Sequence, residues 1–309
     1  MKHNIKITAL LLAMFFVTQF IGLYVVNHYS PVRVVGGEKV NVTAPELPYG
    51  LETPEIEKES DYLNFFPIIV VSFVVAVSLL FLFTKFNLKF ILRGWFFIVI
   101  AIALGIFFNS VIPPFKYSII IVSAISIPLS FIKIFRKNLL VHNITELLIY
   151  PGIAAVFVPI LNIWTIIVLL LLISVYDMCA VWHSGIMQKM AKFQINKLNI
   201  FSGFFVPYVS KAMRMKLRKM RIKAKKTGKK KGIKINVAIL GGGDVVFPII
   251  ASGVMLKTLG VYSSLLVIIG ATLGLGCLFF FSEKKKFYPA MPFISAGILL
   301  GILLSYLIL

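Results

Sequence analysis

The chain has 309 residues, of which 59% are hydrophobic and 14% are charged, and its mean hydropathy is +0.96. This composition excludes an ordinary soluble domain and predicts an all-α protein that crosses a membrane several times. The net charge of +21 does not indicate a nucleic-acid binder, because half of the 32 lysines and arginines lie between residues 184 and 235. The two cysteines lack the spacing of a metal site or a disulfide framework.

Nine apolar runs are long enough to cross the core of a bilayer, and in lipid such spans must be helices. The first is longer than the core of a signal peptide and no A-x-A-like cleavage site follows it, so we expect a span there as well. In chain order the runs are Ile7 to Val26, Phe65 to Thr84, Trp95 to Ile112, Phe115 to Ile132, Leu147 to Ile160, Ile163 to Trp182, Ile235 to Leu256, Val261 to Phe281 and Pro289 to Leu309.

The basic residues of the short connections alternate between the two sides of the membrane. Clusters at residues 2–6, 85–93, 133–137, 211–234 and 284–286 all fall on one side, and an acidic segment at residues 27–64 falls on the other. By the positive-inside rule, the N-terminus of this multi-pass cell-membrane protein is expected in the cytoplasm and the C-terminus outside.

The runs divide the chain into three parts, which are a six-span part at 1–183, a basic cytoplasmic loop at 184–234 and a three-span part at 235–309. The aromatic segment Phe201 to Tyr208 is suited to the membrane interface. The basic segment Lys211 to Lys234 is interpreted as a solvated loop, with attraction to anionic lipid head groups as an alternative. We expect no nucleic acid as a partner, because no stacking aromatic residues interleave these charges.

Two carboxyl groups lie within apolar runs, where an ionisable residue is costly and indicates a functional site. Asp177 lies near the cytoplasmic end of the sixth run and Asp244 near the cytoplasmic start of the seventh. Successive spans are antiparallel, so the two side chains are expected at similar depth, within reach of each other. Two such carboxyls share one proton, so that one accepts a proton from water while the other donates to a peptide carbonyl. This chemistry needs no metal, cofactor or nucleophilic side chain.

The residues around Asp244 predict an irregular backbone. Gly241, Gly242 and Gly243 leave room for a substrate backbone and favour a loosened helix. Pro248 has no N–H to donate to the carbonyl of residue 244. A protease that cuts within a membrane must unwind its substrate and offer the unwound strand a partner, and this segment suits that task.

Three motifs in this order resemble those of the presenilin and signal peptide peptidase family. They are Tyr176-Asp177 in the sixth run, the G-x-G-D of residues 241–244 in the seventh, and Pro289-Ala290-Met291-Pro292 at the start of the ninth. The resemblance implies a presenilin-like fold of nine helices and an intramembrane aspartyl protease whose catalytic residues are Asp177 and Asp244.

The resemblance also implies that the ninth-span motif shapes the site and docks substrate. Met291 stands where the family pattern has leucine, and the two side chains are similar in volume. Tyr176 is expected either to form a hydrogen bond near the two aspartates or to pack. The expected orientation is that of presenilins, which implies transmembrane substrates whose N-terminus is outside. The small size is similar to that of archaeal single-chain members, which implies that no accessory subunits are required.

Other interpretations of the two aspartates stay open at this point. They are the coupling carboxylates of an ion or proton transporter, a structural hydrogen-bonded pair, and the active site of a prepilin or preflagellin peptidase, which lacks the ninth-span motif. Separately, Gly270 with Gly274, and Gly297 with Gly301, have the GxxxG spacing that predicts close helix packing.

Overall fold

The computed structural model describes residues 5–35, 37–52, 54, 56, 58–86, 88–136, 138–183, 202–208, 236–282 and 288–308. Nine helices in these ranges are long and apolar enough to cross a membrane, as the sequence predicts. They are α1 (Ile5–Tyr29), α2 (Glu59–Lys85), α3 (Lys89–Val111), α4 (Ser118–Phe135), α5 (Leu139–Phe157), α6 (Ile163–Met178), α9 (Gly242–Leu259), α10 (Val261–Phe281) and α11 (Met291–Ile308). A π-helical turn, η2 (Cys179–His183), continues α6.

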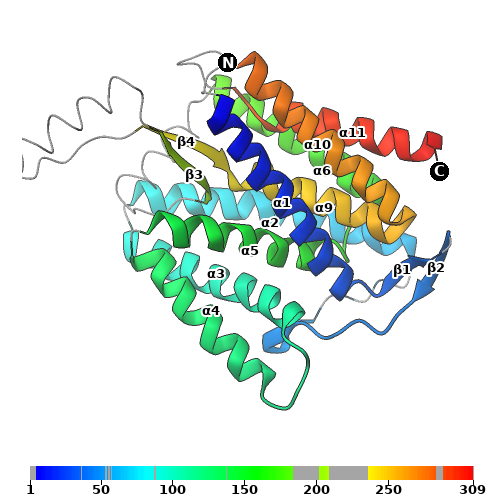
Figure 1. Ribbon diagram of the computed structural model, residues 1–309, viewed down its shortest axis with the longest axis horizontal. Coiled ribbons are helices and arrows are strands. Elements are labelled where there is room, and N and C mark those ends of the chain that lie inside the picture. The colour runs from blue at the N-terminus through cyan, green and yellow to red at the C-terminus, as the bar shows by residue number, and fades with distance from the viewer. Residues whose placement is uncertain are drawn as a thin grey trace, which may run out of the picture.

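Two short antiparallel hairpins accompany the helices. Strand β1 (Val32–Val35) pairs with β2 (Glu38–Asn41), and β3 (Gly203–Tyr208) pairs with β4 (Asn236–Gly241). Figure 1 shows the hairpins at opposite ends of the helical bundle. The predicted basic segment 211–234 lies outside the described residues.

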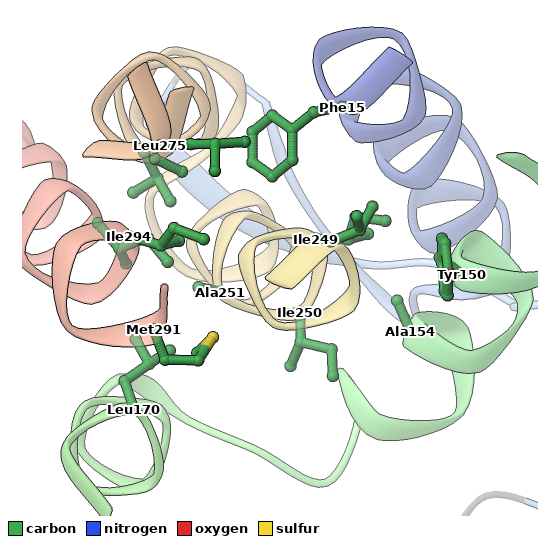
Figure 2. Close-up of a cluster of buried hydrophobic side chains, with 14 of the residues drawn as sticks. Phe15, Tyr150, Ala154, Leu170, Ile249, Ile250, Ala251, Leu275, Met291 and Ile294 are labelled. Atoms are coloured by element: carbon green, nitrogen blue, oxygen red, sulfur yellow. The ribbon is translucent and has the colours of Figure 1, made fainter. Parts of the chain in front are cut away.

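Helix α9 occupies the centre of the bundle and packs against α1, α5, α6, α10 and α11. Figure 2 shows the core around it, to which α1, α5, α6, α10 and α11 contribute apolar side chains. Among those drawn, Phe15, Ile249, Leu275 and Ile294 have no exposed surface. A helix that is apolar on all sides is buried on all sides. The start of α9, which carries Asp244, is therefore held by the surrounding helices.

The seventh span begins later than the sequence analysis places it. Residues 236–241 form β4, with Leu240 opposite Phe204 and Ala238 opposite Val206, and the predicted start of the helix at Ile235 is wrong. Valine and isoleucine favour a strand, and the glycines that follow are poor residues for a helix interior. Asp244 consequently lies in the first turn of α9 and not several turns inside a helix.

The fifth span begins earlier than predicted, at Leu139 instead of Leu147. Asn138 caps it by accepting hydrogen bonds from the backbone N–H groups of Leu140 and Val141. Glu146, predicted to lie outside the apolar runs, is two turns inside α5 and only 1% exposed. Polar residues interrupt the apolar pattern here, but the helix continues because these residues find partners within the bundle.

The partner of Glu146 is Lys133 of α4. The Lys133 ammonium lies 2.5 Å from the Glu146 carboxylate, and both side chains are buried. Lys133 also donates a hydrogen bond to Thr145, and the His142 ring lies 3.7 Å from the same carboxylate. Removing two charges from water is expensive, so each member of this pair depends on the other for its place in the core.

Helices α10 and α11 are joined by interlocking glycines, which confirms the predicted close packing. A Cβ atom on Gly270 would collide with the carbonyl oxygen of Gly297, and one on Gly297 would collide with that of Gly270. A Cβ atom on Gly274 would meet the carbonyl oxygen of Phe293 in the same way. In lipid, where apolar side chains gain little from leaving the solvent, such backbone contact is a main source of helix association.

We predict that Gly270→Ala destabilises the protein by about 1–3 kcal/mol, because the added methyl group must force two backbones apart. Thermal unfolding in detergent measures the loss. Gly276→Ala is the matched control on the same helix, since a Cβ atom there meets nothing within 4 Å. Equal stability of the two variants would contradict the packing described here.

We also predict that Lys133→Met costs about 3–5 kcal/mol, because it leaves the buried Glu146 carboxylate without its cation. The double variant Lys133→Met, Glu146→Gln is expected to recover most of that loss in the same unfolding measurement. Lys85→Met, at an exposed position in the last turn of α2, is the control and should unfold like the wild type. A double variant as unstable as the single one would rule out charge pairing as the cause.

Candidate active site

Asp244 is placed by the junction of a strand and a helix. Strand β4 ends at Gly241, which is also the N-cap residue of α9, and Asp244 is the third residue of the helix. Its carboxyl group accepts a hydrogen bond from the backbone N–H of Gly241. An acidic side chain at this position commonly bonds back to the cap residue, and it is favoured by the positive end of the helix dipole.

Asp177 lies in the last turn of α6 and is 6% exposed. Its Oδ2 atom accepts a hydrogen bond from the backbone N–H of Met291 at 3.1 Å, and the N–H of Ala290 donates to the same carboxyl group. These donors belong to the start of α11, where the first N–H groups of a helix have no partner inside it. Two residues after Asp177 the chain enters the π-helical turn η2, a feature often found at functional sites.

The two carboxyl groups are close enough for the charge of Asp177 to act on Asp244. Helix α6 packs against α9, and α11 packs against both of them. Ser174, one turn before Asp177, donates a hydrogen bond of 2.9 Å to Ser295 of α11. This second link fixes α6 against α11 and so keeps the Met291 N–H directed at Asp177.

The ninth-span motif contributes its backbone to the site and its methionine to the core. Ala290 accepts the first helical hydrogen bond of α11, so Pro292 falls in the first turn, where the missing N–H of proline costs nothing. The Met291 side chain is 3% exposed and lies between Leu170 of α6 and the central helix α9 (Figure 2). A flexible methionine fills the place expected for leucine, while its N–H reaches Asp177.

The three glycines differ in their surroundings. A Cβ atom on Gly242 would collide with the Tyr150 hydroxyl and with Ser202, so this glycine allows a close approach of α5 to α9. Gly243 is exposed, with only the Phe247 ring nearby. The glycines thus mark a boundary between strand and helix, whereas the sequence analysis expected a loosened helix.

The Tyr176 ring packs against α2. Its side chain is 42% exposed, and its ring meets that of Phe73 edge to face at 5.8 Å. Helix α2 packs lightly, against α3 and α6, and none of its apolar span is buried. Tyr176 is therefore a predicted site residue that lies at an exposed edge of the site.

Sequence reasoning missed the polar side chains that support the site from α5. The Tyr150 hydroxyl lies 3.5 Å from that of Ser202, and Ser202 accepts a hydrogen bond from the backbone N–H of Gly242. His142, Asn143 and Glu146 lie on the same side of α5 as Tyr150. Their spacing of three to four residues could have indicated one polar face of a helix, but these three residues precede the predicted fifth span.

Comparison with known proteins identifies the fold and the family. A family model described as signal-peptide peptidase, presenilin aspartyl protease matches residues 46–309. No curated protein matches the chain.

Two solved structures of a presenilin family intramembrane aspartate protease, in space groups C222 and P2, are similar to this structure. The first has a TM-score of 0.61 and 18% sequence identity, and the match covers 98% of this chain and 99% of that chain. The second has a TM-score of 0.60 and 17% identity, and the match covers 97% of each chain. Together with the nine spans, the family match shows that this chain belongs to the signal-peptide peptidase and presenilin family of intramembrane aspartyl proteases.

Proposed function

We propose that Asp177 and Asp244 are the catalytic pair of an endopeptidase that hydrolyses peptide bonds within transmembrane segments. The observation that carries the proposal is that the packed helices α6 and α9 carry two carboxyl groups whose charges interact, each held by backbone N–H groups at the start of a helix. An isolated structural acid needs no such partner. Two carboxyls at one place supply both a proton acceptor and a proton donor.

The proposed reaction uses one shared proton. The ionised carboxylate takes a proton from a water molecule as the water oxygen attacks the peptide carbonyl carbon, and the protonated carboxyl donates its proton to the carbonyl oxygen. The resulting tetrahedral diol then collapses with cleavage of the C–N bond. The amine leaves with a proton from the newly protonated aspartate, and a diol hydroxyl returns a proton to the other, so the pair regains its starting state.

A substrate must be extended before its peptide bonds are accessible, and β4 offers an edge for an extended strand. Phe205 of β3 uses both its N–H and its C=O to bond to Asn143, away from β4. Its partner across the hairpin is Ile239, which must then direct its own N–H and C=O away from β3. No further strand pairs with β4 in the described residues. An open strand edge favours pairing with another chain.

We propose that substrates approach this edge from the side of α2. The α2 helix is lightly packed, and its Phe73 lies against Tyr176, the residue next to Asp177. Displacing a ring contact of this kind costs about 0.5–1.5 kcal/mol, which a substrate helix can replace with its own contacts.

The proposed substrates are single transmembrane segments whose N-terminus is outside. The charge pattern favours a cytoplasmic N-terminus for this chain, as in presenilins, and the resemblance to presenilins implies this substrate orientation. The N-terminal end of α1 lies toward the end of the bundle that holds the β3–β4 hairpin (Figure 1). Under this orientation Asp244 faces substrate near the cytoplasmic half of the bilayer. One chain would act without accessory subunits.

We predict that Asp177→Ala and Asp244→Ala each lower cleavage of a single-span substrate at least about 100-fold, since general acid–base catalysis supplies that much or more. Purified protein in lipid and mass spectrometry of the products provide the measurement. Glu38→Gln, on the exposed strand β2, is the control carboxyl variant and should cleave like the wild type.

Substantial cleavage by either aspartate variant with its fold intact would rule out the proposed pair. A transporter would instead take up an ion or solute along a gradient in proteoliposomes and release no peptides. A prepilin-type peptidase would cleave only near the cytoplasmic end of a leader segment. The three outcomes are distinguished by the products and by their positions in the substrate.

We also predict that Ile239→Pro lowers kcat/KM about 3- to 10-fold, which is the effect of losing one hydrogen bond of about 1 kcal/mol. Proline removes the N–H on the open edge of β4 and leaves the bonds to β3 in place. Ile239→Ala keeps that N–H and controls for the lost side chain. If both variants cleave equally well, the β4 edge does not pair with substrate.

A further inference from the structure

Helix α5 carries a polar face inside an otherwise apolar bundle. At about 100° per residue, His142, Asn143, Glu146 and Tyr150 fall within about 100° of one another around the helix axis. Glu146 is neutralised by Lys133, as described above. The other three side chains all contact the segment Ser202 to Phe205.

Asn143 binds β3 as a neighbouring strand would. Its amide nitrogen donates to the carbonyl oxygen of Phe205 at 2.8 Å, and its amide oxygen accepts from the N–H of Phe205 at 2.9 Å. The His142 ring forms a hydrogen bond of 2.8 Å with the carbonyl oxygen of Gly203 and lies 4.8 Å from the Phe205 ring. Two parallel bonds between one amide and one residue fix the position of β3 along α5.

This attachment continues to the catalytic carboxyl through backbone groups alone. Strand β3 is paired with β4, and the carbonyl oxygen of Ser202 accepts the N–H of Gly242. Strand β4 ends at Gly241, whose N–H holds the carboxyl group of Asp244. The position of Asn143 on α5 therefore determines where β4 lies, whereas Asp244 itself is held by the helices that surround α9.

We propose that Asn143 is a positioning residue that sets the register of cleavage, a proposal that rests on the proposed function above. A strand advances about 3.3 Å per residue, so a shift of the hairpin by that distance brings the next peptide bond of a paired substrate to the carboxyl pair. Strand register is weakly specified where pairing relies on the backbone alone. The two hydrogen bonds of the Asn143 amide fix the register, because they hold the hairpin to a rigid helix.

The test is the distribution of cleavage positions. Wild type, Asn143→Ala and Asn143→Asp are compared on one single-span substrate by mass spectrometry of the products. Asn143→Ala removes both bonds and is expected to reduce the share of the main product at least about twofold, with new products one or two residues away. Asn143→Asp keeps an oxygen that accepts the Phe205 N–H, but its second oxygen faces the Phe205 carbonyl oxygen. This variant is expected to give a distribution of products between those of the wild type and Asn143→Ala.

Asn138→Ala is the matched control, because it removes the cap of the same helix without touching the hairpin. It should lower the unfolding temperature and leave the cleavage positions unchanged. The proposal would be overturned if Asn143→Ala cleaved the substrate at the wild-type positions. If Asn143→Ala does not fold, the same result with Asn143→Asp would overturn it. Absence of Asp244-dependent products from the wild type would instead contradict the proposed function.

Discussion

Backbone N–H groups at the starts of two helices allow a pair of carboxyl groups to lie inside this apolar bundle. A carboxyl group in hydrocarbon is expensive unless donors surround it. Met291 and Ala290 at the start of α11 provide them for Asp177, and Gly241 at the start of α9 provides one for Asp244. Both groups thus use donors that any helix start leaves unpaired, so the position of each helix start determines the position of each acid.

The rest of the fold keeps those two helix starts in place. The core drawn in Figure 2 surrounds α9 with side chains from α1, α5, α6, α10 and α11, which hold it in place. Helix α11 is tied to α6 through Ser174 and Ser295 and to α10 through glycine backbones. The strand that leads into α9 is held from the side by α5. Each support acts on the position of a helix or strand backbone.

Much of this arrangement could be predicted from the sequence. The nine spans follow from hydropathy, and the two aspartates are recognisable because acids are rare in apolar runs. The β3–β4 hairpin could not be predicted, since its strands are separated by a long basic stretch and the pairing of distant segments has no local signal. The polar face of α5 was missed for a related reason. Glu146 is unfavourable in a membrane helix by itself, and only the three-dimensional fold brings Lys133 to it.

The interlocked glycines of α10 and α11 have a mechanical consequence. Helices that touch through their backbones have no compressible side chains between them, so the pair behaves as one stiff rod across the bilayer. The end of this rod holds the Asp177 carboxyl through the Met291 N–H. A bilayer thinner or thicker than the rod tilts it as a unit. A change in the thickness of the surrounding lipid is therefore expected to displace the Asp177 carboxyl.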